Sequence, residues 1–161
     1  MALNWAMLDD VSCQPVPLPE EQTFFQVGNC SLSLKFGDQK VHYEAEGSCY
    51  VTNQRVVFVK EGGKPSELVS LSVPLDHFCD YRYIIPIFTA PYIESTVYPV
   101  EGGGLPQREP GATSPPKGDL RLWFAQGGGL TMKEALGRAK ANFEERRNAR
   151  REEEQLPAYE E

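Results

Sequence analysis

The last residues of the sequence contain a short segment with the chemistry of a peptide ligand. Leu156, Pro157, Ala158 and Tyr159 follow a run of charged residues. Pro157 disfavours a helical conformation at Leu156, so this segment should be extended and close to polyproline II. WW domains bind such peptides by placing a proline in an aromatic groove and a tyrosine two residues later in a separate pocket. We predict that Leu156 and Pro157 contact the groove of a WW-domain protein, such as a HECT-type ubiquitin ligase, and that Tyr159 is the anchor. The alternative is a chance match, which should occur in on the order of a few per cent of chains of this length.

A second group of residues could bind a lipid headgroup. Lys35 and Lys40 flank a predicted turn, and a cluster of positive charge at the open end of a barrel attracts anionic lipids. Asp38, Glu44 and Glu46 lie close in the sequence and dilute the positive charge. A phosphoinositide-binding or membrane-binding module is therefore the alternative function, with Lys35 and Lys40 as its lipid contacts.

The side chains that metal sites and catalysts use are few and scattered. The two histidines and four cysteines share no ligand spacing, which argues against a zinc site or a disulfide framework; these residues are Cys13, Cys30, Cys49, Cys79, His42 and His77. Asp76 and His77 are neighbours on a predicted strand, so their side chains should point to opposite faces. We find no nucleophile beside a base and expect no enzyme, no cofactor and no metal.

Length and charge limit the function further. A chain of 161 residues is long enough for one core and too short for two. Its net charge of −7 argues against direct binding of nucleic acid, which needs a surplus of Lys and Arg. The sequence has no signal peptide pattern and no run of about 18 apolar residues. We expect a monomeric intracellular protein with reduced thiols.

The elements that must position these residues are mostly strands. Three segments alternate apolar and polar residues with the period of a half-buried strand. Their inward residues should be Leu32, Leu34 and Phe36, then Val69, Leu71 and Val73, then Leu120, Leu122 and Phe124. Further strands are predicted over 43–52, 55–60, 77–85 and 92–98, and Pro86 and Pro91 bracket a turn. About seven antiparallel strands indicate a small barrel or sandwich.

Residues 47–60 predict a hairpin in detail. A two-residue turn at Asn53-Gln54, with Asn adopting a positive φ, places Val51 opposite Val56. That register puts four apolar side chains on one face: Cys49, Val51, Val56 and Phe58. We therefore interpret Cys49 as a small core residue.

Near the end of the domain, the spacing of apolar residues changes from that of strands to that of a helix. Residues 101–118 are rich in glycine and proline and predict a mobile loop. Thr131 should then cap a helix with Glu134 reaching back to it, and one stripe should pack on the barrel: Met132, Leu136, Ala139 and Phe143. Beyond Phe143 the helix loses its apolar face, so it should continue as a solvated charged arm.

Strands closed by one C-terminal helix outline the pleckstrin-homology (PH) superfold. Gly47-x-x-Tyr50-x-Thr52-x-x-Arg55-Val56-Val57-Phe58 resembles the signature of GRAM domains, a branch of that superfold. Several other segments resemble the WW-domain-binding protein two family, especially its short fungal-type members: MALNW at the start, Tyr92-Ile93 with Val97, Glu101-Gly102-Gly103-Gly104, and Leu120-Arg121-Leu122-x-Phe124-x-x-Gly127-Gly128.

This resemblance implies a non-enzymatic adaptor that binds WW domains and acts as a transcription coactivator in the cytoplasm and nucleus, with only indirect contact to chromatin. It divides the chain into an N-terminal segment (1–20), a GRAM or PH-like domain (21–143) and a charged helix and tail (144–161). Animal relatives carry several Pro-Pro-x-Tyr motifs. Here Pro115-Pro116-Lys117-Gly118 lacks the tyrosine, which leaves the Leu-Pro-x-Tyr motif.

Overall fold

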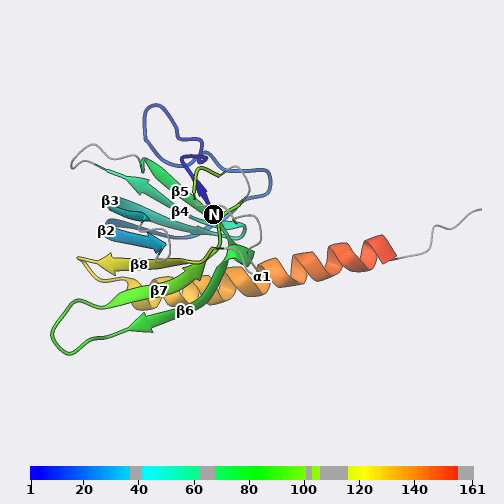
Figure 1. Cartoon of the computed structure of the whole chain (residues 1–161). Coiled ribbons are helices and arrows are strands. Elements are labelled where there is room, and N and C mark those ends of the chain that lie inside the picture. Colours follow the sequence, from blue (N-terminus) through cyan, green and yellow to red (C-terminus); the bar gives the residue numbers. More distant parts are fainter. Residues whose placement is uncertain (37–40, 62–67, 101–102, 106–115, 156–161) are drawn as a thin grey trace, which may run out of the picture.

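The computed structural model describes residues 1–36, 41–61, 68–100, 103–105 and 116–155. In this part of the chain, eight antiparallel strands form one curled sheet in the order β1-β5-β4-β3-β2-β8-β7-β6, and a long helix packs on it (Figure 1). The elements are β1 (Ala2–Leu3), β2 (Thr23–Phe36), β3 (Val41–Thr52), β4 (Arg55–Lys60), β5 (Ser70–Pro74), the 3-10 helix η2 (Leu75–His77), β6 (Phe78–Ile84), β7 (Tyr92–Val97), β8 (Gly118–Phe124) and α1 (Gly129–Gln155). None of the helices within these ranges is long and apolar enough to cross a membrane.

The core lies between the inner face of the sheet and α1. The predicted inward residues of β2 and β8 are all buried, as are Leu71 and Val73 of β5. The prediction for Val69 is wrong, because its side chain is half exposed. The reason is a tertiary contact: the backbone amides of Val69 and Ser70 both donate to Asn4 Oδ1, at 2.8 and 3.0 Å, and Val69 lies before the strand, which begins at Ser70.

The β3–β4 hairpin has the predicted register, with Val51 paired to Val56 and Cys49 to Phe58. Its turn forms for another reason than the one predicted, because neither Asn53 nor Gln54 has a positive φ. Thr52 Oγ1 instead accepts hydrogen bonds from the amides of Gln54 (3.1 Å) and Arg55 (3.0 Å). A threonine side chain that bonds the backbone two and three residues on stabilises a turn without a left-handed residue.

Helix α1 begins three residues earlier than predicted, at Gly129. Thr131 lies inside its first turn and is not the cap, because the Met132 amide already donates to the Gly128 carbonyl at 2.9 Å. Gly128 has a φ of +104°, and a Cβ on Gly129 would lie 2.5 Å from Tyr83 Cε2. The turn and the close approach to β6 therefore both need glycine, which fixes where the helix starts.

The rest of α1 follows the prediction. Met132, Leu136 and Ala139 are buried, and Phe143 packs half-buried against the core. From Glu144 the side chains are exposed except that of Arg147, and the helix extends beyond the sheet toward the right of Figure 1. It reaches Gln155, which is the limit of the described residues.

Residues 1–20 pack on the body, although the sequence suggested a separate segment. The Met1 side chain is buried in the core, and β1 pairs with β5. The described part of the predicted loop 101–118 joins this contact: Leu105 is buried, and the Leu3 amide donates to the Gly103 carbonyl at 2.8 Å. Residues 101–102 and 106–115 of that loop lie outside the described residues.

Candidate functional site

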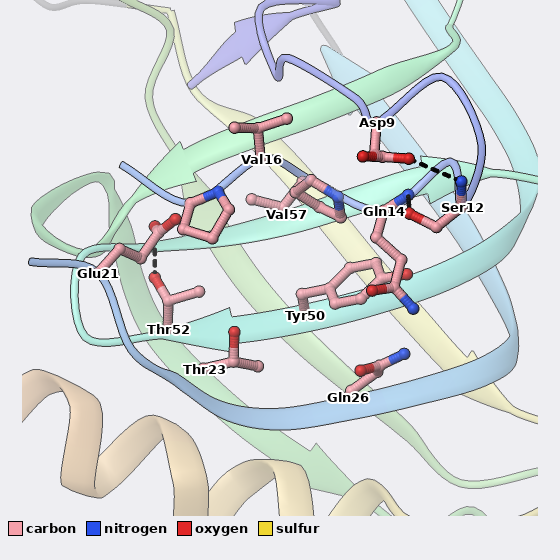
Figure 2. Close-up of a pocket in the computed structure, with 12 residues that line it drawn as sticks. Asp9, Ser12, Gln14, Val16, Glu21, Thr23, Gln26, Tyr50, Thr52 and Val57 are labelled. Atoms are coloured by element: carbon pink, nitrogen blue, oxygen red, sulfur yellow. Dashed lines mark hydrogen bonds between the residues drawn. The ribbon is translucent and has the colours of Figure 1, made fainter. Parts of the chain in front are cut away.

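A pocket of about 300 Å³ opens between the N-terminal segment and the outer face of the sheet (Figure 2). One wall is the loop over residues 9–17, and the other comes from the strands β2, β3 and β4. The residues that line it are Asp9, Ser12, Gln14, Pro15, Val16, Pro17, Glu21, Thr23, Gln26, Tyr50, Thr52 and Val57. The pocket exists because the N-terminal segment crosses the sheet without lying flat on it.

Hydrogen bonds within the N-terminal loop hold the first wall. The Asp9 carboxylate accepts from the amides of Val11 (2.9 Å) and Ser12 (2.8 Å), and these bonds lower the pKa of Asp9. The Asp9 amide in turn donates to the Gln14 carbonyl at 2.8 Å. Asp9 is thus used as a turn residue, and its carboxylate is already satisfied.

A buried ion pair holds the other end of the pocket. Arg55 Nε lies 2.9 Å from Glu21 Oε2, and both side chains are less than a tenth exposed. Burial disfavours the charge on Glu21, but hydrogen bonds from Arg55, the Leu18 amide and Thr52 outweigh it, so the pKa of Glu21 lies below its usual value. Arg55 also donates to the Val16 carbonyl at 3.2 Å and so ties the loop to the β3–β4 turn.

The floor of the pocket is polar but not reactive. Burial, with the nearby Glu61 charge second, raises the pKa of Tyr50, so its hydroxyl stays protonated. Gln14, Gln26 and Thr23 add neutral donors and acceptors (Figure 2). Among the described lining residues there is no histidine, lysine or cysteine to act as base or nucleophile. This arrangement of neutral donors and acceptors can bind a small polar group.

A second polar cluster surrounds the N-terminal amine. The amine of Met1 donates to the Tyr98 carbonyl at 2.8 Å and lies 3.1 Å from His77 Nδ1. Burial lowers the pKa of this amine to about 5, and the Asp76 charge opposes the shift only in part. A neutral amine is a nucleophile in principle, but Met1 is fully buried, so the cluster is structural. In the described ranges no three His, Cys, Asp or Glu side chains converge as a metal site would require.

The sequence-predicted contact residues are mostly beyond what the structure describes. Leu156, Pro157, Tyr159 and Lys40 lie outside the described residues. Lys35 is exposed on β2, where its neighbours across the sheet are His42 on β3 and Asp119 on β8. An acidic neighbour weakens any anion site built on Lys35.

Comparison with known proteins matches no family model and no curated sequence. Solved structures do match. The Vps36 N-terminal PH domain superposes with a TM-score of 0.58 and 18% identity, over 88% of this chain and 94% of that one. The chain has a pleckstrin-homology-like fold. A chain of the 8S snRNP assembly intermediate also superposes on this protein, with a TM-score of 0.52 and 19% identity, over 79% of this chain and 88% of that one.

The fold prediction is therefore confirmed at the level of a mainly β, PH-like sheet with a C-terminal helix. Membership of the WW-domain-binding protein two family stays a prediction, because the similarities at 18% and 19% identity carry the fold alone. The pocket under the N-terminal segment was not predicted from the sequence. Residues 86–91 were predicted only as a turn, although their lack of charge is visible in the sequence.

Proposed function

We propose that this PH-like domain is a non-enzymatic adaptor that presents the Leu156-Pro157-Ala158-Tyr159 motif to WW-domain proteins. The observation that carries the proposal is the length of α1 beyond the body. Ala139 is the last fully buried residue of the helix, and Gln155 is the residue that precedes the motif. Phe143 still packs against the core, and the twelve helical residues that follow it rise about 18 Å, so the motif is joined to a point away from the core.

Ion pairs support the use of α1 as a spacer. Arg146 lies 2.9 Å from Glu20 of the N-terminal segment. Arg147 pairs with Glu144 at 2.9 Å along the helix. Exposed pairs of this kind add little stability, but they are what a solvated charged helix forms. A HECT-type ubiquitin ligase would be a suitable partner, and coactivation in the nucleus would require such a recruited protein, since this chain has a net charge of −7 and no basic surplus for DNA.

The test is a titration of the full chain, and of a peptide spanning residues 150–161, against a panel of WW domains. We expect weak binding that Tyr159→Ala and Pro157→Ala each abolish, because one loses the anchor and the other the groove contact. Ala158→Ser is the matched control and should bind like the wild type. Equal binding by all four proteins would overturn the proposal.

The alternative is an anionic lipid site at Lys35 and Lys40. It keeps some support because Lys35 is exposed and because membrane-binding modules are compatible with a PH-like fold. Flotation with phosphatidylserine vesicles tests it. Salt-sensitive binding that Lys35→Glu and Lys40→Glu remove would favour this function over the adaptor.

A further inference from the structure

The tip of the β6–β7 hairpin is an exposed apolar surface. Ile85, Ile87 and Phe88 are 70%, 91% and 95% exposed. The hairpin projects beyond the rest of the sheet at the lower left of Figure 1, away from the end of α1. All ten residues from Tyr83 to Tyr92 are uncharged. A soluble domain rarely leaves three large apolar side chains together in water unless they meet a partner.

The strand register arranges the hairpin in layers behind this tip. The first row across the sheet is Ile84, Tyr92 and Trp123, with the Tyr92 and Trp123 rings 5.6 Å apart. Two residues further from the tip, Arg82 and Arg121 lie on either side of Glu94. Two strand residues span about 7 Å, so the charged row lies about 7 Å behind the aromatic row, and both rows lie behind the apolar tip.

We propose that this hairpin inserts its tip, Ile85, Ile87 and Phe88, into the interfacial region of a lipid bilayer. The hairpin presents apolar side chains at its tip, then Tyr and Trp, then arginines. A membrane interface accommodates side chains in this order, from the acyl chains outward to the headgroups. Interfacial segments reach about 5–10 Å below the headgroups, and the tip can enter to this depth without burying a charge, because the charged row lies behind both the tip and the aromatic row. Pro86 and Pro91 help, because a proline has no amide hydrogen that would lose water on insertion.

The shape and charge of the hairpin decide between a bilayer and other occupants. A convex tip needs a deep complementary cavity in a protein partner, whereas a bilayer deforms around it. The two arginines are partly neutralised, since Arg82 lies 3.7 Å from Glu94 and Arg121 lies 3.8 Å from it. The chain as a whole carries a net charge of −7, which disfavours anionic surfaces. Apolar insertion, and not lipid charge, therefore drives the binding.

The experiment is co-flotation of the full chain with small vesicles of phosphatidylcholine, at low salt and at about 0.5 M salt, where charge interactions are screened. We expect binding that salt does not weaken. Ile87→Ser and Phe88→Ser should each lower the partition coefficient about tenfold, as expected for one large apolar side chain. Val11→Ser is the matched control, because Val11 is also 95% exposed but lies in the N-terminal loop; it should bind like the wild type.

A second measurement reports insertion directly. A Phe88→Trp variant should show a blue shift of emission and quenching by brominated lipid beyond those of the wild type, which has Trp5 and Trp123. Three results would overturn the proposal: no binding to phosphatidylcholine, binding to phosphatidylserine alone that salt abolishes, or a concentration-dependent dimer that Phe88→Ser dissociates. Phe88→Ser should still bind WW domains if the adaptor function is correct, so the two proposals fail independently.

Discussion

The turns of the β3–β4 and β6–β7 hairpins differ in both polarity and burial. The β3–β4 turn is polar and yet buried: Asn53 is 5% exposed, its amide group bonds to Glu20 and Gln22, and Arg55 is paired with Glu21 beside it. The β6–β7 tip is apolar and yet bare, with Phe88 95% exposed. The N-terminal segment covers the turn of the β3–β4 hairpin. At the β6–β7 hairpin, the Met1 amine instead bonds at the opposite end from the tip, to the carbonyl of Tyr98 just after β7.

This contrast separates stability from function. A buried polar turn is stable only while every polar group keeps its partner, so changes there should unfold the domain. An exposed apolar tip contributes little to folding, so its retention needs another reason.

The largest effect should come from the buried side of the β3–β4 hairpin. Phe58 is 2% exposed and pairs across the sheet with Cys49. Phe58→Ala should lower the free energy of unfolding by about 3–5 kcal/mol, because it removes a buried ring and leaves a cavity. Chemical denaturation measures the loss, and Phe58→Leu, which keeps most of the volume, should cost much less. An unchanged midpoint for Phe58→Ala would contradict the observed packing.

The buried ion pair at the same turn should rank second. Arg55→Met leaves the Glu21 carboxylate buried without its cation and should cost about 2–3 kcal/mol. The double variant Arg55→Met with Glu21→Gln should recover part of the loss, because no buried charge then remains. If the double variant is less stable than the single one, the hydrogen bonds of Glu21 to Leu18 and Thr52 matter more than its charge.

The same pair sets a pH dependence in acid. The pKa of Glu21 is lower in the folded chain than in the unfolded chain, so its stabilising effect is complete above the unfolded value of about 4.3. It is lost as the pH falls through the folded value. Unfolding free energies between pH 6 and pH 3 should show this decline, and Arg55→Met should make it shallower. An equal decline in both proteins would assign the acid sensitivity to other carboxyls.

The sequence predicted the covered hairpin better than the bare one. The register of residues 47–60 followed from period-2 burial, since one slipped residue would expose Val51 and Phe58. The packing of the N-terminal segment over the β3–β4 turn could not be predicted from the sequence. Arg55 donates to Glu21, which is 34 positions away, and this contact depends on how the sheet curls. The helix start was misplaced for a similar reason: a capping pattern at Thr131 is local, whereas the Gly129–Tyr83 approach is tertiary.

A second pH effect should arise at the base of the β6–β7 hairpin. Above about pH 8 the Met1 amine is neutral in both states, and its folded pKa is about 5. Between these values the unfolded chain binds a proton that the folded chain does not, so the melting temperature should fall as the pH falls from 8 to 5. The groups that face the amine are His77, the Tyr98 carbonyl and Asp76.

Two variants make this prediction specific. Asp76→Asn removes the charge that raises the amine pKa, so the decline should continue below pH 5. His77→Gln tests whether the contact of the imidazole with the amine matters, because it removes His77 Nδ1, which lies 3.1 Å from the amine, and leaves the amine itself. A melting temperature that stays constant in the wild type from pH 8 to pH 6 would show that the amine is solvated.

The smallest effect on stability should come from the tip itself. Phe88→Ala deletes the same ring as Phe58→Ala, in the same fold, but the ring is 95% exposed and not 2% exposed. Burial scales with the area removed from water, so the change in unfolding free energy should stay within about 0.5 kcal/mol. The two variants thus differ in environment, and the difference between their two unfolding free energies measures what burial in the core contributes at Phe58. A loss above about 1 kcal/mol for Phe88→Ala would mean that the tip folds back onto the body in solution, and it would remove the basis for a free apolar tip.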